Sequence, residues 1–180
     1  MRKYLFSLLV LAAAGSTLLV AAFAAAGGGS HEISAKDGLE GYQEVAAIST
    51  TGHGTFEAKV NEDGSSFDWT LSYSGLEGSI TQSHIHFGQR SVSGGISIFL
   101  CSNLGNGPAG TPPCPPSPAT ISGTADVTDM TNGALAQGIA AGEFDEILAA
   151  IRAGKAYANV HTTTWPGGEI RGQLNDPNDK

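Results

Sequence analysis

The sequence predicts an all-β protein, a sandwich or barrel of antiparallel strands with one short helix near its C-terminal end. Two features of the 180-residue chain support this fold class. Short stretches in which apolar and polar residues alternate recur from residue 53 onwards, separated by segments rich in Gly, Asn, Asp and Ser. One later segment breaks this pattern, because its apolar residues recur at the spacing of a helix.

The stretches with alternating residues are the predicted strands. In the first of them, Phe56, Ala58 and Val60 alternate with polar residues, so one face of the strand is expected to enter a core. Runs of this length and spacing are typical of an antiparallel sheet. The predicted strands span residues 53–61, 67–76, 79–88, 95–101, 119–127, 156–162 and 168–174.

The predicted helix spans residues 142–154. Its apolar residues recur at i, i+3, i+4 and i+7, which places them on one face. Acidic residues at its start and basic residues at its end suit the helix dipole, and Gly154 is a suitable stop. We expect this helix to close one end of the sandwich with its apolar face, formed by Phe144, Ile147, Leu148 and Ile151.

The N-terminal segment predicts export. Residues 1–26 carry a basic start, Arg2 and Lys3, then an apolar run that ends in a small-residue cleavage pattern at Ala24 and Ala26. This order is typical of a cleaved signal peptide. The alternative is an uncleaved membrane anchor, because the apolar run is long enough to span a bilayer.

The remainder predicts one domain: a flexible leader at 27–36, a domain at 37–175 and a short tail at 176–180. Cleavage would remove two basic residues and no acidic ones, so the net charge would change from −8 to −10. This acidity disfavours nucleic acids and anionic membrane surfaces as partners. We expect a secreted or periplasmic protein with no stable membrane insertion after cleavage, whose partner is an extracellular protein or a small ligand.

The two cysteines, Cys101 and Cys114, flank a loop rich in Gly and Pro. In an exported chain an even number of cysteines predicts a disulfide bond. A zinc site is disfavoured because a single pair at this distance does not match the spacing of zinc-binding cysteines.

Three of the five histidines lie in predicted strands: His84, His86 and His161. His84 and His86 project from the same face of their strand, because residues two apart share a face, and Ile85 projects from the other. In the strand with His161, Val160 likewise faces the opposite side. We therefore expect the three histidines on one face, directed away from the core.

This face carries further polar residues, Asn159, Glu169 and Arg171. The hairpin between the last two strands is expected to place Glu169 beside His161 and Arg171 beside Asn159. One interpretation is a hydrogen-bonded ladder that fixes the register of the strands. The other is a metal site, since imidazoles suit copper or zinc and a carboxylate can orient a histidine ligand.

Enzymatic motifs are not evident, and the sequence favours a non-enzymatic module. Ser83 precedes His84 without the G-x-S-x-G pattern of a nucleophile elbow. Asp126, Asp129, Asp145 and Glu146 lie in turn or helix-cap contexts, so no pair of glycosidase carboxylates is apparent.

Three stretches, SHIHFG at 83–88, GGISIFL at 94–100 and the segment 141–174 that ends in PGGEIRGQL, resemble the CHRD domain, the module named after chordin. The resemblance extends over residues 37–175 and implies an immunoglobulin-like antiparallel Greek-key β-sandwich. Chordin is an extracellular protein that binds growth factors, and many bacterial secreted proteins carry a single such module. The positions that match the family pattern are His84, His86, Asn159, His161, Pro166, Gly167, Gly168, Glu169 and Arg171.

This chain carries one such module and lacks the cysteine-rich repeats of chordin, so growth-factor antagonism does not transfer to it. The sequence therefore predicts a secreted binding or structural module of the bacterial, single-domain type. The alternative is a copper-type metal protein that uses His84, His86 and His161, with redox activity as an extension.

Overall fold

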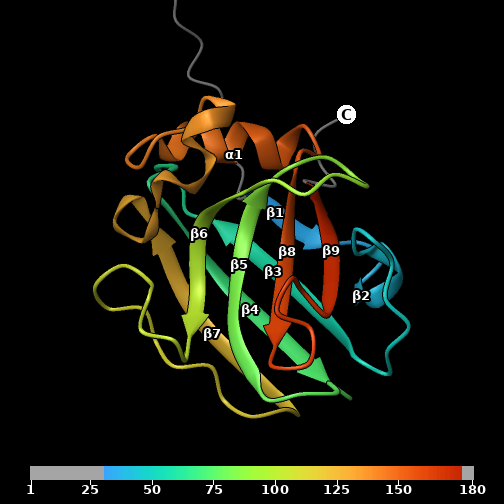
Figure 1. The fold of residues 1–180 in the computed structure, drawn as a ribbon. Coiled ribbons are helices and arrows are strands. Elements are labelled where there is room, and N and C mark those ends of the chain that lie inside the picture. The colour runs from blue at the N-terminus through green and yellow to red at the C-terminus, as the bar shows by residue number, and fades with distance from the viewer. Residues whose placement is uncertain (1–30, 176–180) are drawn as a thin grey trace, which may run out of the picture.

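The computed structural model describes residues 31–175, and within this range the chain forms nine strands, three short 3₁₀ helices and one α-helix (Figure 1). The strands are β1 (Glu32–Ala35), β2 (Leu39–Glu40), β3 (His53–Val60), β4 (Ser66–Ser74), β5 (Ile80–Phe87), β6 (Gly95–Ser102), β7 (Ala119–Asp126), β8 (Ala156–Thr162) and β9 (Ile170–Asn175). The helices are η1 (Gly41–Gln43), η2 (Val127–Asp129), η3 (Asn132–Gln137) and α1 (Phe144–Arg152). No helix in this range is long and apolar enough to cross a membrane.

The strands form two packed layers that are joined along one edge. The pairing order is β6-β5-β8-β9-β1-β3-β4-β7, and β2 pairs with both β3 and β9. One layer holds β6, β5, β8 and β9, and in Figure 1 these strands lie in front of β3, β4 and β7. The chain leaves β4, forms the β5–β6 hairpin and returns to place β7 beside β4, which is a Greek-key connection. This arrangement confirms the prediction of an antiparallel β-sandwich with one short helix.

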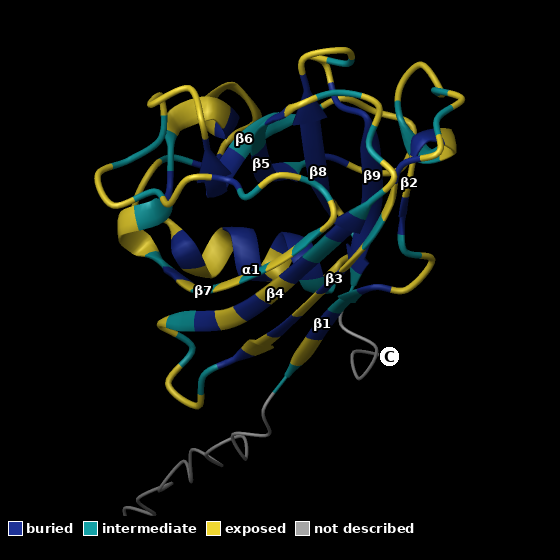
Figure 2. Ribbon diagram, turned by 90° about the horizontal axis from the view of Figure 1, so that it is seen from below, coloured by how far each residue is buried: buried dark blue, intermediate teal, exposed yellow. Residues whose placement is uncertain are grey.

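The β3-β4-β7 layer has one buried and one solvated face. Phe56 and Leu71 are paired across β3 and β4, and both are buried in the core. Along each of the two strands, the residues that alternate with the buried ones are exposed or partly exposed, as Figure 2 shows by the alternating colours of β3 and β4. This layer therefore follows the predicted alternation of a half-buried antiparallel strand.

The helix α1 lies across one end of the sandwich (Figure 1). It buries the predicted apolar face, and Gly154 follows it with a positive φ of 65°. A residue without a β-carbon adopts this left-handed conformation without strain, which explains the helix end. The buried residues of the helix are Phe144, Ile147, Leu148, Ala150 and Ile151.

The prediction of a flexible leader at 27–36 is wrong for its last part. Residues Glu32–Ala35 form β1, which pairs with β3 and with β9 and so helps to join the two layers. Ile33 is 2% exposed and belongs to the core. The predicted signal peptide and the predicted C-terminal tail lie outside the described residues.

The predicted disulfide between Cys101 and Cys114 is present. Cys101 lies in β6, and Cys114 lies in the Pro-rich loop that leads to β7. The side chain of Asn103 bonds both the backbone N–H and the carbonyl of Cys114, which fixes the loop against β6. A cross-link that closes a loop of this size stabilises a fold by about 3 kcal/mol on the chain-entropy account.

Candidate metal centre

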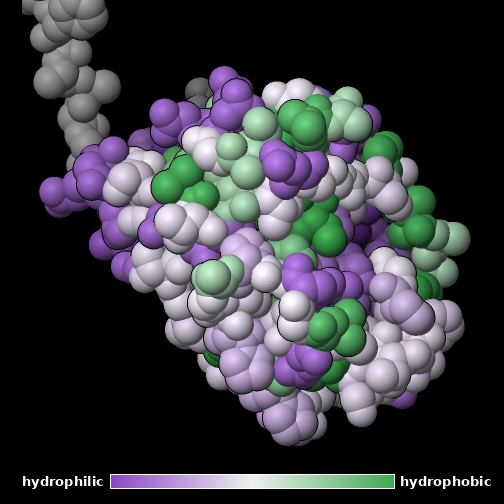
Figure 3. Space-filling view, turned by 60° about the vertical axis from the view of Figure 1, so that its left-hand side comes forward, coloured by the Kyte–Doolittle hydropathy of each residue, from purple (hydrophilic) through white to green (hydrophobic). Residues whose placement is uncertain are grey.

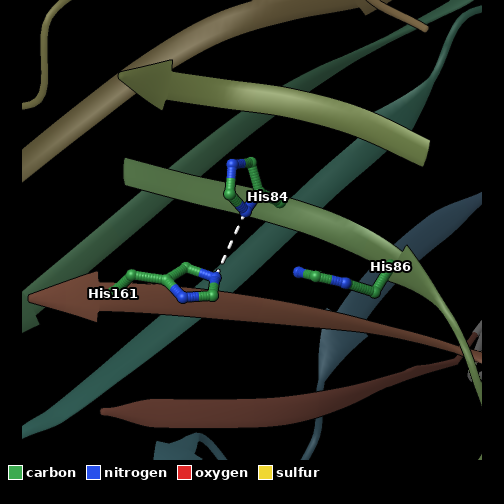
Figure 4. A group of neighbouring side chains, drawn as sticks. All are labelled: His84, His86 and His161. Atoms are coloured by element: carbon green, nitrogen blue, oxygen red, sulfur yellow. Dashed lines mark hydrogen bonds between the residues drawn. The ribbon is translucent and has the colours of Figure 1, made fainter. Parts of the chain in front are cut away.

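The strands β5 and β8 bring His84, His86 and His161 together, as Figure 4 shows. The register pairs His84 with Asn159, so His161 lies on the neighbouring diagonal of the same face. The ring centroids of His84 and His161 are 4.9 Å apart, those of His84 and His86 5.4 Å, and those of His86 and His161 5.9 Å. The predicted convergence of the three histidines is therefore confirmed.

Two irregularities in the β5–β6 pairing each lie directly before one of the first two histidines. The register shifts between Ser83 and His84, and again between Ile85 and His86. Such bulges increase the local twist and re-aim side chains, and they are common beside functional sites. Ile85 remains fully buried in the core, as the strand alternation predicts.

Backbone carbonyls orient two of the imidazoles. The Nδ1 atom of His86 lies 2.9 Å from the carbonyl oxygen of Gly94, and Nδ1 of His161 lies 3.0 Å from that of Pro166. A carbonyl oxygen only accepts hydrogen bonds, so both Nδ1 atoms carry the proton. In the neutral ring the Nε2 atoms of His86 and His161 then carry lone pairs. A bond from Nδ1–H to a carbonyl is the usual way in which a protein orients a histidine ligand of a metal.

The three imidazoles have more nitrogen lone pairs inside the cluster than N–H groups that could donate to them. The Nε2 atom of His161 faces Nδ1 of His84 at 3.2 Å, so this contact satisfies one acceptor at most. The Nε2 atoms of His86 and of His84 are buried and have no hydrogen-bond partner. Buried polar atoms without partners are rare in folded proteins, and each one needs an explanation.

The nitrogens can reach one ion. One ligand atom from each ring lies within 4.8 Å of the other two. In a three-coordinate site with bonds of about 2.0 Å the nitrogens are about 3.5 Å apart, so each ring needs to move by about 1 Å or less. The hydrogen bonds assign Nδ1 of His84 and Nε2 of His86 and His161 as the inward-facing atoms.

Burial keeps the three rings neutral. The side chains of His84, His86 and His161 are 0%, 7% and 5% exposed. Burial is the largest cause that lowers the pKa of His84, to about 2, and the neighbouring imidazoles add to it. Burial lowers the pKa of His86 to about 4 and also lowers that of His161, although the carbonyl bonds act in the opposite direction. Neutral imidazole is the form that binds metals.

The face with the histidines is covered, whereas the sequence predicts that it points away from the core. The loop of residues 88–94 lies over it and is hydrogen-bonded to four side chains of this face. Three of them donate to loop carbonyls, and the fourth, the Tyr157 hydroxyl, accepts from the backbone N–H of Gly94. The edge of His84 also packs on Phe99, with the ring centroids 4.3 Å apart. Loop contacts of this kind leave no periodic signal in a sequence. The four side chains are those of His86, Tyr157, Arg171 and Gln173.

Tyr157 connects the histidines to Arg171, and it is not among the site residues predicted from the sequence. Its ring stacks on that of His86 at 4.7 Å between centroids, and the guanidinium carbon of Arg171 lies 3.4 Å from its centroid. Because β8 lies between β5 and β9, the tyrosine separates the imidazole from the guanidinium. The Arg171 guanidinium also donates to the carbonyl oxygens of Gln89 and Val92.

Asn159 is paired with Arg171 across β8 and β9, as predicted. Its side-chain amide donates to Oε1 of Glu44 at 2.6 Å and to the carbonyl of Ile170. Burial raises the pKa of Glu44 to about 7, although the Asn159 bond and the charge of Arg171 oppose this effect. Glu44 lies in a segment without regular alternation, so no sequence signal points to it.

The predicted role of Glu169 is wrong. Its carboxylate accepts hydrogen bonds from the hydroxyls of Thr50 and Thr162 and from the backbone N–H of Glu77, each at 2.7 Å. Thr162 follows His161 in β8, so the two side chains project from opposite faces. Glu169 precedes the first residue of β9, so strand alternation does not fix the direction of its side chain. The Pro166 carbonyl, and not this carboxylate, orients His161.

Comparison with known proteins supports the resemblance found in the sequence. The family model of the CHRD domain matches residues 37–174, which is most of the chain. No curated protein and no solved structure shows significant similarity to it. The match includes β5, β8 and β9 and therefore the whole histidine cluster. The chain belongs to the CHRD family.

Proposed function

We propose that this protein is a secreted CHRD module that binds one transition-metal ion through His84, His86 and His161. The observation that carries the proposal is the convergence of inward-facing nitrogens in a buried site, where Nε2 of His86 has no partner. Imidazole ligands suit copper and zinc. A bound ion would accept the lone pair on Nε2 of His86, which the protein itself leaves unsatisfied.

The alternative is a binding or structural module in which the histidines only hold the strands together. That role leaves a buried acceptor on His86 unpaired, which costs about 1–3 kcal/mol. A protein-docking role would use the surface instead. The exposed large hydrophobic residues are spread over several segments of the chain, and on the face in Figure 3 hydrophobic and hydrophilic residues are interspersed. The metal hypothesis explains the unpaired Nε2 of His86, and the alternative does not.

Secretion is part of the proposal. The disulfide between Cys101 and Cys114 fits an oxidising compartment, where such bonds form and persist. The sequence of residues 1–26 has the order of a signal peptide. Mass spectrometry of the exported protein would test this part, because the proposal expects a chain that lacks residues 1–26.

Metal binding is tested by titrating copper and zinc into the metal-free, exported protein and measuring stoichiometry by elemental analysis. We expect one equivalent per chain in the wild type and none in His86→Ala or His161→Gln. His53→Ala is the matched control, because His53 is an exposed histidine that bonds Thr51 and Ser74 outside the cluster. Circular dichroism confirms that each variant is folded. Equal binding by the wild type and His86→Ala would contradict the proposal.

A further inference from the structure

We infer that the ion held by this site is copper in its monovalent state, Cu(I), bound by three imidazoles without a fourth ligand. The inference rests on the proposed metal site and names the ion. Three features carry it: the number of donors, the charge around them and their burial.

The first feature is the donor set. Among the described residues, the ligating groups gathered at this place are three histidines, without a carboxylate or thiolate. Zn(II) takes four ligands in tetrahedral geometry. Cu(II) prefers a square or tetragonal set of ligands. Cu(I) has a filled d shell, imposes no such geometry and is stable with three nitrogen ligands.

The acidic and sulfur-containing side chains of this region are engaged elsewhere. Both carboxylate oxygens of Glu169 are engaged: Oε1 accepts from the Thr50 hydroxyl and the Glu77 backbone N–H, and Oε2 accepts from the Thr162 hydroxyl. The carboxylate of Glu44 is bonded to Asn159. Cys101 and Cys114 form the disulfide. The described structure therefore supplies no anion to neutralise a doubly charged ion at the site.

The second feature is the neighbouring positive charge. Arg171 is 2% exposed and lies on the far side of the Tyr157 ring from His86. Its guanidinium is held there by the carbonyls of Gln89 and Val92. Repulsion by a fixed cation is proportional to the charge of the ion, so a divalent ion is disfavoured twice as strongly as a monovalent one. The penalty for burying an uncompensated charge also rises steeply with that charge.

The third feature is the closure of the site. The three rings are at most 7% exposed, and the 88–94 loop covers them. Water ligands would complete the coordination of Zn(II) or Cu(II) in an open site, whereas a covered site favours an ion that needs none. A surface pocket of about 440 Å³ is lined mainly by residues of β3, β4 and β7, and the cluster does not contribute to it.

The test compares four ions with the metal-free wild-type protein. Cu(I) is measured under anaerobic conditions in competition with bicinchoninate, Ag(I) serves as a monovalent ion without redox chemistry, and Zn(II) and Cu(II) are measured with chromophoric chelators. We expect one equivalent of Cu(I) or Ag(I), bound at least a thousandfold more tightly than either divalent ion. X-ray absorption of the Cu(I) form should give three nitrogen neighbours.

A variant tests the charge argument separately. Arg171→Gln should lower the ratio of the Cu(I) affinity to the Zn(II) affinity about tenfold. Arg90→Gln, which removes an exposed arginine of the same loop that pairs with Asp37, should leave it unchanged. Should Arg171→Gln fail to fold, the ranking of ions in the wild type decides the inference alone.

The outcomes separate this inference from the proposed function. Tighter binding of Zn(II) or Cu(II) than of Cu(I), lost in His86→Ala, would keep the metal site and overturn its assignment to monovalent copper. A fourth strong ligand in the absorption spectrum would also overturn it. Absence of binding for all four ions would overturn the metal site itself.

Discussion

The two layers of the sandwich use the same strand architecture for different purposes. In the β3-β4-β7 layer one face packs on the core and the other meets solvent, so burial alternates along each strand. In the layer of β5, β8 and β9 both faces are buried, and every residue of β8 is buried. The second buried face of that layer carries histidine, tyrosine, asparagine, arginine and glutamine side chains. The proposed metal site lies in the layer that buries polar groups at a cost in desolvation.

The largest expected effect lies in the layer with the simple alternation. Leu71→Ala removes a fully buried side chain of β4 that is paired with Phe56, so a cavity is left in the core. We expect the free energy of unfolding to fall by about 2–5 kcal/mol, as measured by urea denaturation. Copper affinity of the folded variant should stay within twofold of the wild type. A large loss of affinity would show that packing in the β3-β4-β7 layer affects the metal site in the other layer.

A smaller loss is expected when the polar layer is disturbed. Arg171→Gln removes donors from the carbonyls of Gln89 and Val92, and buried acceptors without partners cost about 1–3 kcal/mol. We expect amide hydrogen exchange in the 88–94 loop to accelerate more than that in β3 and β4. Uniform acceleration across both layers would mean that the arginine stabilises the whole fold and not the loop.

Glu44, which is bonded to Asn159 of the polar layer, should make the stability of the protein depend on pH. Burial raises its pKa to about 7 from 4.5, so the folded protein favours the neutral acid, whereas the carboxyl group ionises at a lower pH in the unfolded chain. Its contribution to stability is therefore fully present below pH 4.5 and is lost as the pH rises to about 7. One pKa unit corresponds to about 1.4 kcal/mol, so a shift from 4.5 to about 7 amounts to about 3.5 kcal/mol.

Glu44→Gln isolates this contribution, because the buried histidines titrate in the opposite sense in both proteins. Urea denaturation at pH 4.5 and pH 7.5 should show that the variant gains stability relative to the wild type as the pH rises. An equal pH response in the two proteins would contradict the raised pKa.

The smallest effect is expected on the solvated face of β4. Thr70 is exposed, and its hydroxyl bonds that of Ser122 on β7. We expect Thr70→Val to change the free energy of unfolding by less than about 0.5 kcal/mol in thermal or urea denaturation. A loss above 1 kcal/mol would show that this face has a structural role beyond strand pairing.

The regular parts of the fold could be predicted because their burial is periodic. The alternation of Phe56, Ala58 and Val60 and the helical spacing of residues 144–151 each report one buried face. The strand β1 was missed because its four residues are too few to establish a period. The double burial of β8 was missed because its second cover is a loop, and loop contacts do not follow the strand period.

The histidine cluster could be predicted for the same reason. His84, His86 and His161 are each adjacent to an apolar residue that must face the core, so their common face follows from strand alternation. Residues beyond the strand ends could not be placed in this way. Glu169 therefore turns to Thr162 and not to His161. The carbonyls of Gly94 and Pro166 carry no side-chain signal at all.

The most direct measurement of the central claim is histidine side-chain ¹⁵N NMR of the metal-free and Cu(I)-loaded protein at pH 7. The account predicts that His86 and His161 carry the proton on Nδ1 before metal is added, as their carbonyl bonds require. Addition of one equivalent of Cu(I) should shift Nε2 of both residues and Nδ1 of His84, and leave His53 unchanged. Protonated imidazoles in the metal-free protein, or unchanged nitrogen shifts after Cu(I) is added, would contradict it.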